Sequence, residues 1–200
     1  TRTCPACDGT RLGERVRSTL IDGMDLGEAS RLTLTELREW VSRVPGLVPE
    51  EVAPMARVIV DEMTEPMQRL VELGLSYLSL DRASSTLSNG ERQRVQLARA
   101  VRNQTAGVLY VLDEPTIGLH PANVDGVLAI IRQLIADGNS VVVVDHDTRV
   151  LGAADHLIEI GPGAGADGGR VIFQGSIDEA SRAPASRIGP YMAGLRRVER

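Results

Sequence analysis

The chain has 200 residues, a net charge of −5 and a hydrophobic fraction of 42%, which suits one substantial domain, or one domain with a small appendage. The charge argues against a surface that binds nucleic acid throughout, although residues 81–102 contain five arginines and two acids. Apolar runs such as 108–112 and 141–144 are far shorter than the roughly 20 residues of a membrane span, and residues 1–4 lack the apolar core of a secretion signal. We therefore expect a soluble cytoplasmic protein with no membrane partner.

All 22 basic residues are arginine, and the chain contains no lysine. Any chemistry that requires a lysine must therefore come from another polypeptide segment. The phosphate-binding P-loop, G-x-x-x-x-G-K-[ST], is such a case.

The two cysteines, Cys4 and Cys7, form a C-x-x-C pair. In an intracellular protein this spacing is typical of half a zinc site or of a redox pair. A structural zinc ion takes four ligands, so a zinc site here needs ligands from outside the chain. No strand–turn–helix pattern surrounds the pair, which disfavours the redox interpretation. Half a zinc site and an inert remnant both stay open.

Helical spacing of apolar residues extends over 35–41 and 50–74. Pro54 suits the first turn of the second helix, whereas Pro66 is expected to kink or break it. We expect the methionine-rich stripe of this segment to belong to the core.

Strands and helices are predicted to alternate after residue 75. The apolar runs 108–112 and 141–144 are typical of parallel strands buried on both faces, and an amphipathic helix lies between them and ends at 137–139. Strands are expected over 156–160 and 170–174, joined by the glycine-rich stretch 161–169. A capping box at 176–179 begins a last helix. The fold class is therefore α/β, with a parallel sheet at its core.

Several segments carry side chains suited to one chemistry. Asp113 and Glu114 follow the first apolar strand, at the sheet edge where α/β proteins bind ligands; there an aspartate can hold Mg²⁺ and a glutamate can polarise water. His146 follows the next strand and can bond a phosphate oxygen. Ser88 and Glu91 form a capping box at the start of a helix, where free N–H groups and the helix dipole favour an anion. A tight loop, 116–121, comes directly after the acids.

The order and spacing of these segments resemble the layout of ABC ATPases. The resemblance implies an ABC-type fold that binds ATP and Mg²⁺, with Asp113 as the Walker B aspartate, Glu114 as the catalytic glutamate and His146 as the switch histidine. It also assigns Ser88, Asn89, Gly90 and Glu91 to the signature motif. The D-loop would contain Gly118, Leu119 and His120. ABC sites are composite, so the signature would serve one site, and the acids and the histidine another.

Five stretches resemble the UvrA family in particular: 4–12, 77–82, 113–121, 160–169 and 189–194. The resemblance implies the C-terminal part of the first ATPase module of an excinuclease subunit in nucleotide excision repair. Implied partners are DNA, the rest of the chain with its Walker A loop, a second ABC module, a homodimer partner and a UvrB-like protein. We expect a CxxC-containing half zinc module (1–30), a helical signature-domain region (31–80), the C-terminal half of the ATPase domain (81–183) and a basic tail (184–200).

Three positions depart from the family pattern: Asn89 replaces a usual glycine, Asp145 replaces a usual glutamate, and Pro66 interrupts a helix. They favour a divergent UvrA-like paralogue, and resistance to DNA-intercalating drugs is one alternative function. A non-catalytic ABC-like module for binding or dimerisation is another. A transporter fragment fits less well because the D-loop differs, and an SMC-like fragment because heptads are absent.

The isolated chain is expected to be inactive, because it has no P-loop. The arginines of the signature helix, at 92, 94, 99 and 102, either meet DNA phosphates or are solvated and paired with acids.

Overall fold

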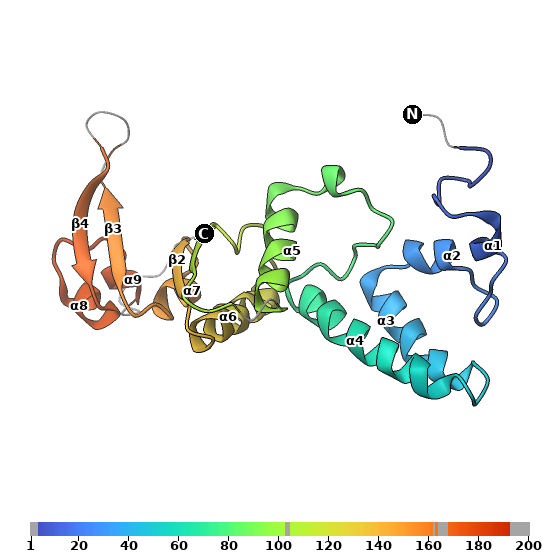
Figure 1. Ribbon diagram of the computed structural model, residues 1–200. Helices are drawn as coiled ribbons and strands as arrows, with labels where there is room; N and C mark the ends of the chain where they lie inside the picture. Colours follow the sequence, from blue (N-terminus) through green and yellow to red (C-terminus); the bar gives the residue numbers. More distant parts are fainter. Residues whose placement is uncertain (1–3, 103–104, 162, 164–167, 193–200) are drawn as a thin grey trace. The chain divides into compact units, whose positions relative to one another are not determined.

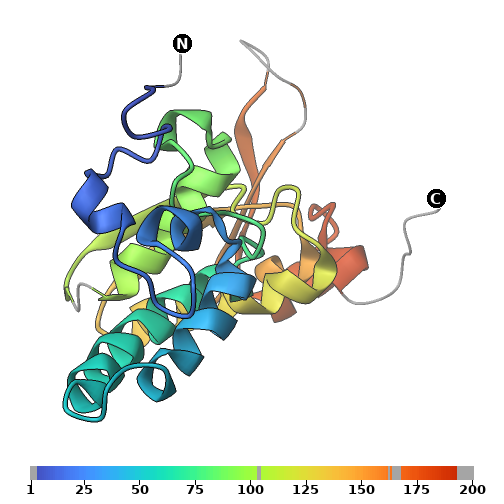
Figure 2. The same cartoon turned by 90° about the vertical axis from the view of Figure 1, so that its right-hand side faces the viewer.

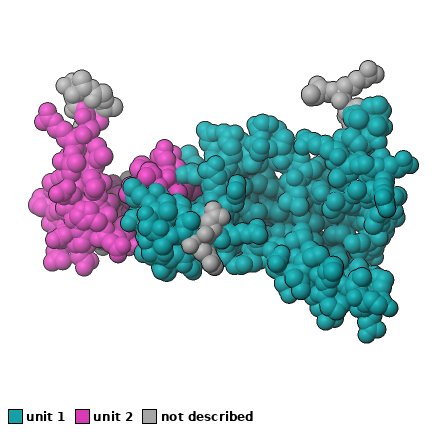
Figure 3. Space-filling model, viewed as in Figure 1, with its two compact units in different colours: residues 1–110, 117–141 teal, residues 111–116, 142–200 magenta. Residues whose placement is uncertain are grey.

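The computed structural model describes residues 4–102, 105–161, 163 and 168–192. The chain divides into two compact units, residues 1–110 with 117–141 and residues 111–116 with 142–200 (Figure 3). In the first unit the described elements are α1 (Glu14–Arg17), α2 (Leu26–Arg31), α3 (Leu34–Arg43), η1 (Val44–Gly46), α4 (Ala53–Glu72), η2 (Ser84–Thr86), α5 (Asn89–Arg102) and α6 (Pro121–Ala136) (Figure 1). In the second they are α7 (Thr148–Gly152), β3 (Leu157–Gly161), β4 (Arg170–Gly175), α8 (Ile177–Arg182) and α9 (Gly189–Met192). Strands β1 (Leu109–Asp113) and β2 (Ser140–Val144) contribute residues to both units.

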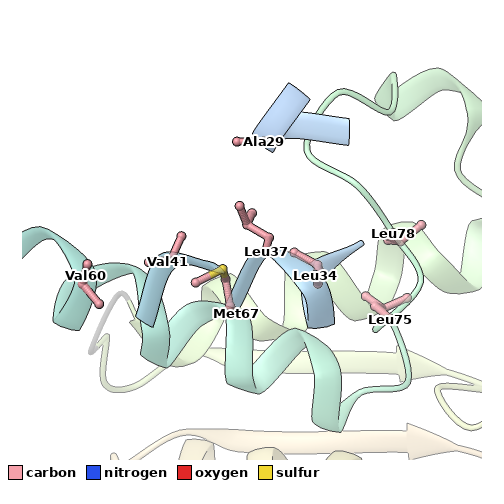
Figure 4. Close-up of a cluster of buried hydrophobic side chains, with 8 residues drawn as sticks. All are labelled: Ala29, Leu34, Leu37, Val41, Val60, Met67, Leu75 and Leu78. Carbon is pink, nitrogen blue, oxygen red and sulfur yellow. The ribbon is translucent and has the colours of Figure 1, made fainter. Parts of the chain in front are cut away.

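Helices α3 and α4 lie side by side in both ribbon views and share the core of the first unit (Figures 1 and 2). A capping box begins α3: the side chain of Thr33 accepts from the backbone of Glu36, and the Glu36 side chain accepts from the backbone of Thr33. The buried cluster draws on α2, α3, α4 and the segment that follows α4 (Figure 4). Its members are Ala29, Leu34, Leu37, Val41, Val60, Met67, Leu75 and Leu78.

Pro66 does not break α4, contrary to the expectation from sequence. The helix runs without interruption from Ala53 to Glu72, with Pro54 in its first turn as expected. Proline removes one backbone hydrogen bond from a helix, but Val60 and Met67, on either side of Pro66 in sequence, are both buried in the cluster. This packing holds the helix together across the missing bond.

The methionine-rich stripe of α4 is only partly core, which corrects the sequence interpretation. Met67 is buried and Met63 packs against the cluster, whereas Met55 is 69% exposed and Val58 and Ile59 are also exposed. The N-terminal half of α4 therefore presents an apolar surface to solvent.

Helix α6 packs closely on α4 at Gly126. A Cβ atom at Gly126 would lie 2.4 Å from the carbonyl oxygen of Glu72, so a larger residue here would force the two helices apart. The C-terminal end of α6 confirms the predicted stop: Asp137 caps the helix, and Gly138 follows with φ of 86°.

Strands β1 and β2 pair in parallel, as predicted. The N–H of Ser140 donates to the carbonyl of Val108 at 2.9 Å, and the N–H of Glu114 donates to the carbonyl of Val144 at 2.7 Å. The expectation that both faces of these strands are buried is wrong for the described residues. Leu109, Val111, Val142 and Val144 are exposed, because no described element covers that face.

The second unit contains an antiparallel pair, β3 and β4, at the predicted positions. A capping box of Ser176 and Glu179 begins α8, as the sequence predicts, and Ala180 of this helix is buried with Leu151 and Leu157. Most of the glycine-rich stretch between the strands lies outside the described residues, as do residues 193–200 of the predicted tail. No helix in the described part of the chain has the length and apolar character to cross a bilayer.

Candidate functional site

The predicted capping box at the start of α5 is present. The backbone N–H of Ser88 donates to Oε2 of Glu91 at 2.6 Å, and the backbone N–H of Glu91 donates to Oγ of Ser88 at 3.2 Å. Helix α5 begins at Asn89 and runs for 14 residues. Serine and glutamate three residues apart thus fix this turn locally, and we call residues 88–91 the signature turn.

Glu91 is a buried carboxylate held from two segments of the chain. The hydroxyl of Tyr77 donates to its Oε1 at 2.7 Å, and Nη1 of Arg82 lies 3.5 Å from the same oxygen. The hydrogen bond from Tyr77, followed by those from Ser88 and the charge of Arg82, lowers the pKa of Glu91 to about 2. Burial and the bond to Glu91 in turn raise the pKa of Tyr77. Glu91 is therefore ionised at neutral pH.

The signature turn offers donors to an anion. Among the described residues, no acceptor takes the backbone N–H of Asn89 or of Gly90. Ser88 is exposed, and its hydroxyl hydrogen can rotate toward a ligand oxygen. Together with the dipole of a long helix, these groups form a site of the kind that binds phosphate.

Arg94 lies beneath the signature turn and is 6% exposed. Its Nη1 donates to the carbonyl of Ile117 at 3.3 Å, and a Cβ atom at Gly90 would lie 3.2 Å from the same nitrogen. Gly90 thus leaves room for the guanidinium, which ties α5 to the loop after the acids. Arg94 is unavailable to DNA at the surface, whereas Arg92, Arg99 and Arg102 are exposed.

Asn89, the departure from the usual glycine, bonds its carboxamide oxygen to the guanidinium of Arg92. The α5 helix begins at Asn89 in spite of the substitution. The added side chain therefore has a partner one turn along the helix and leaves the turn intact.

Asp113 and Glu114 lie at the carboxyl end of β1, where the sequence places them, and both are exposed. The backbone of Glu114 is in the left-handed region, with φ of 47°. Such a conformation is uncommon for residues other than glycine and is concentrated at functional sites. The next residue, Pro115, has a buried side chain. Glu114 therefore lies between β1 and a proline that is held in place by packing.

Asp145 organises the turn after β2. Its fully buried side chain accepts hydrogen bonds from the backbone N–H and hydroxyl of Thr116 and from the backbone N–H groups of His146 and Asp147. It thereby joins the loop of the acid pair to the turn that presents His146. The imidazole of His146 is 77% exposed, so one of its nitrogens is open to a ligand. We call residues 145–147 the switch turn.

Two predicted D-loop residues have local structural roles. Gly118 adopts φ of 70°, which favours glycine. His120 caps α6, because its Nδ1 accepts from the backbone N–H of Ala122 at 3.2 Å. Both residues are exposed, and their contact with nucleotide stays a prediction.

Cys4 is exposed and Cys7 is half-buried. Backbone N–H groups of Ala6 and Cys7 lower the pKa of the Cys4 thiol, which favours the thiolate that a metal binds. No group of three or more His, Cys, Asp or Glu side chains in the described ranges is placed to hold a metal ion. The pair fits half of a zinc site, and the zinc prediction stays open.

The predicted site residues divide between the two units. The first unit contains Ser88, Asn89, Gly90 and Glu91, together with Gly118, His120 and the two cysteines, whereas the second contains Asp113, Glu114 and His146. Sequence reasoning missed the role of Tyr77 and Arg82, because no local pattern pairs them with Glu91. It noted Asp145 only as a departure, although an aspartate directly after an apolar strand is a signal for a turn that its side chain organises.

The parallel strands, the acid pair after β1 and the capped start of α5 are features of an ABC-type ATPase fold. The family model described as ABC transporter matches residues 15–117, and the chain belongs to this family.

Within it, the chain belongs to the UvrA branch. It is 42% identical over 197 residues to UvrABC system protein A of Thermus thermophilus, covering 98% of this chain and 21% of that protein. Identity to the corresponding protein of Bacillus subtilis is 39% over 193 residues, or 96% of this chain and 20% of that one. The crystal structure of UvrA2 from Deinococcus radiodurans matches with a TM-score of 0.85 and 36% identity, over 98% of this chain and 25% of that chain. The chain thus spans about a fifth of the length of these relatives.

Proposed function

We propose that this chain supplies the signature turn of one ATP site, and the acid pair with the switch turn of another, in a UvrA-type ATPase. The observation that carries the proposal is the start of α5: two backbone N–H groups without an acceptor among the described residues, beside an exposed serine, at the end of a 14-residue helix. This arrangement suits the phosphates of a nucleotide.

The second cluster carries the hydrolytic chemistry. Asp113 would hold Mg²⁺ through water, and the metal would neutralise charge on the phosphates. Glu114 orients and polarises the attacking water as general base. His146 would bond a phosphate oxygen, and Asp145 holds Thr116 and the backbone of His146 through hydrogen bonds to one carboxylate.

The two proposed ATP sites need further residues that this chain does not contain. The chain contains no lysine and hence no P-loop, and it spans about a fifth of its relatives. The exposed apolar face of β1 and β2 fits the same proposal, since such a face is normally covered in a parallel sheet. The family's split layout places the Walker A loop elsewhere in the longer protein, and a second module and a homodimer partner would supply the facing surfaces.

For the whole protein we propose that ATP binding and hydrolysis are coupled to recognition of DNA damage in excision repair. Relatives at 38–42% identity are named UvrABC system protein A, which supports this role. Arg92, Arg99 and Arg102 are the exposed arginines of α5 and are candidates for phosphate contacts. A UvrB-like protein is a further proposed partner, and zinc at Cys4 and Cys7 a further proposed cofactor.

The test is ATP hydrolysis by the full-length protein that contains these residues. Glu114→Gln keeps the size of the side chain and removes the base, so we expect kcat to fall by a factor of about 100 or more, with nucleotide binding retained. Glu39→Gln in α3, whose exposed side chain lies in the other unit, is the matched control and should hydrolyse ATP normally. Equal activity of Glu114→Gln and the parent protein would contradict the proposal.

The isolated 200-residue chain should show negligible hydrolysis, because it has no P-loop. Mg²⁺-dependent turnover by the purified chain that disappears in Glu114→Gln would overturn this expectation.

Asn89 favours one alternative, a module that binds or dimerises without catalysis. The two interpretations differ in what Asn89→Gly does in the full-length protein. Our proposal expects nucleotide affinity within about threefold of the parent, because the turn already forms with asparagine. If the parent binds no nucleotide and Asn89→Gly does, the non-catalytic alternative is correct.

A further inference from the structure

The segment between α4 and α5 is anchored in the helical core of the first unit. Leu75 and Leu78 are buried members of the cluster, and Figure 4 shows them on the connection that leaves α4, beside Leu34 at the start of α3. Backbone bonds fasten the same segment: Leu34 N–H to Leu78 carbonyl at 2.8 Å, and Asp81 N–H to Ser30 carbonyl at 3.0 Å. Its position is therefore set by α2, α3 and α4.

Two side chains of this anchored segment reach the signature turn. The hydroxyl of Tyr77 donates to Oε1 of Glu91, and the guanidinium of Arg82 lies beside the same oxygen. Tyr77 is otherwise 53% exposed, so its ring contributes little to the core. The hydroxyl is the part of Tyr77 that has a specific partner, and that partner is a carboxylate.

The carboxylate of Glu91 connects these two side chains to Ser88. While Oε1 is held by Tyr77 and Arg82, Oε2 accepts from the backbone N–H of Ser88 at 2.6 Å. A carboxylate is rigid, so fixing one oxygen fixes the direction of the other. Arg82 adds a second attachment, since its Nη2 donates to the carbonyl of Thr86 at 3.2 Å, directly before the turn.

We infer that Tyr77 and Arg82 are positioning residues that set the geometry of the signature turn from the helical cluster of α2–α4, acting through Glu91. A ligand or partner that shifts this helical cluster thereby shifts Ser88, and nucleotide bound at Ser88 resists the shift. The inference rests on the proposed function, because it assigns to the signature turn a role in nucleotide binding.

The first experiment uses Tyr77→Phe in the full-length protein, which removes the hydroxyl and keeps the ring. We expect kcat/KM for ATP to fall about two- to tenfold, the range of one net hydrogen bond, in a protein that still unfolds in a single cooperative transition well above the assay temperature. Ser79→Ala is the control: it lies in the same segment and loses a hydroxyl contact to Asp81 at 2.5 Å, away from Glu91. It should leave kcat/KM within twofold of the parent.

The second experiment asks whether Tyr77 acts through Glu91. In a double-mutant cycle, Tyr77→Phe should have almost no further effect on kcat/KM in a Glu91→Ala background, which offers the hydroxyl no acceptor. Hydrogen exchange gives a readout without catalysis: the amide of Ser88 should exchange faster in Tyr77→Phe, and at the parent rate in Ser79→Ala.

The outcomes separate this inference from the proposed function. If the parent protein hydrolyses ATP and loses the activity in Glu114→Gln, the proposed function holds. Parent-like kcat/KM and Ser88 exchange in Tyr77→Phe would then overturn the positioning role alone, as would effects of Tyr77→Phe and Glu91→Ala that simply add. A parent protein without ATP hydrolysis would instead overturn the function on which the inference rests.

Discussion

The signature turn and the switch turn are held in shape by hydrogen bonds of different origin. Each is organised by a single buried carboxylate, Glu91 in the first unit and Asp145 in the second. Glu91 takes only Ser88 from its own turn and depends on Tyr77 and Arg82 from a segment anchored elsewhere. Asp145 takes the next two backbone N–H groups of its own turn and adds Thr116.

This difference shows which residues determine the conformation of each turn. The switch turn is set largely by its own sequence, with one fastening to the acid loop. The signature turn combines its own capping box with tertiary contacts that Tyr77 and Arg82 bring from the segment anchored in the helical cluster. A change far away in α3 or α4 should therefore reach Ser88 and leave His146 in place.

The largest expected effect tests the switch turn. Asp145→Ala removes the acceptor shared by the Thr116 hydroxyl and the backbone N–H groups of Thr116, His146 and Asp147, so we expect the second unit to lose roughly 2–4 kcal/mol of stability. Denaturant unfolding at neutral pH measures this. His146→Ala is the control, and its exposed side chain predicts a change within about 0.5 kcal/mol. Similar losses for the two variants would contradict the central role of Asp145.

A smaller effect is expected for Glu91 and depends on pH. The folded pKa of Glu91 is about 2, below the ordinary value of about 4.3, so its ionised form contributes stability that is complete above about pH 5. This contribution is lost as the pH falls toward 2.

Glu91→Gln should therefore cost about 1–2 kcal/mol at pH 7 and progressively less below pH 5, as denaturant midpoints at several pH values will show. The exposed Glu39→Gln on α3 serves as control and should match the parent at every pH. A Glu91→Gln deficit that stays constant down to pH 2.5 would show that the carboxylate charge is not the source of the stability.

The smallest effect concerns the strained backbone of the acid pair. Because Glu114 has φ of 47°, a glycine should be more stable there than an alanine by about 1 kcal/mol. The measurement compares thermal unfolding of Glu114→Gly with that of Glu114→Ala, and neither variant should hydrolyse ATP in the full-length protein. Equal stability of the two variants would show that the turn carries no strain.

Local patterns were enough to predict several features of this fold. The capping boxes at Ser88 and Ser176, the helix end at Asp137 and the position of the acid pair after β1 all depend on residues within a few positions of one another. Hydrogen bonds across a single turn form wherever the right side chains stand at that spacing. The same locality explains why the motif order was sufficient to predict the ABC-type fold.

Other features were missed because their causes lie far apart in the sequence. Pro66 was expected to interrupt α4, but Val60 and Met67 on either side of it are held in the cluster. Strands β1 and β2 were expected to be buried on both faces, yet burial depends on what covers a face. Apolar runs indicate that a cover is needed and do not reveal which segment supplies it.

By itself, then, the sequence determined the helix starts, the strand runs, the acid pair and the absence of a lysine-bearing loop, because each is a property of a short stretch. Only the tertiary structure decided that Tyr77 and Arg82 converge on Glu91, that Arg94 reaches the carbonyl of Ile117, and that Asp145 reaches Thr116. These contacts join residues 9 to 29 positions apart, and they form only when packing of the helices and strands has already brought the segments together.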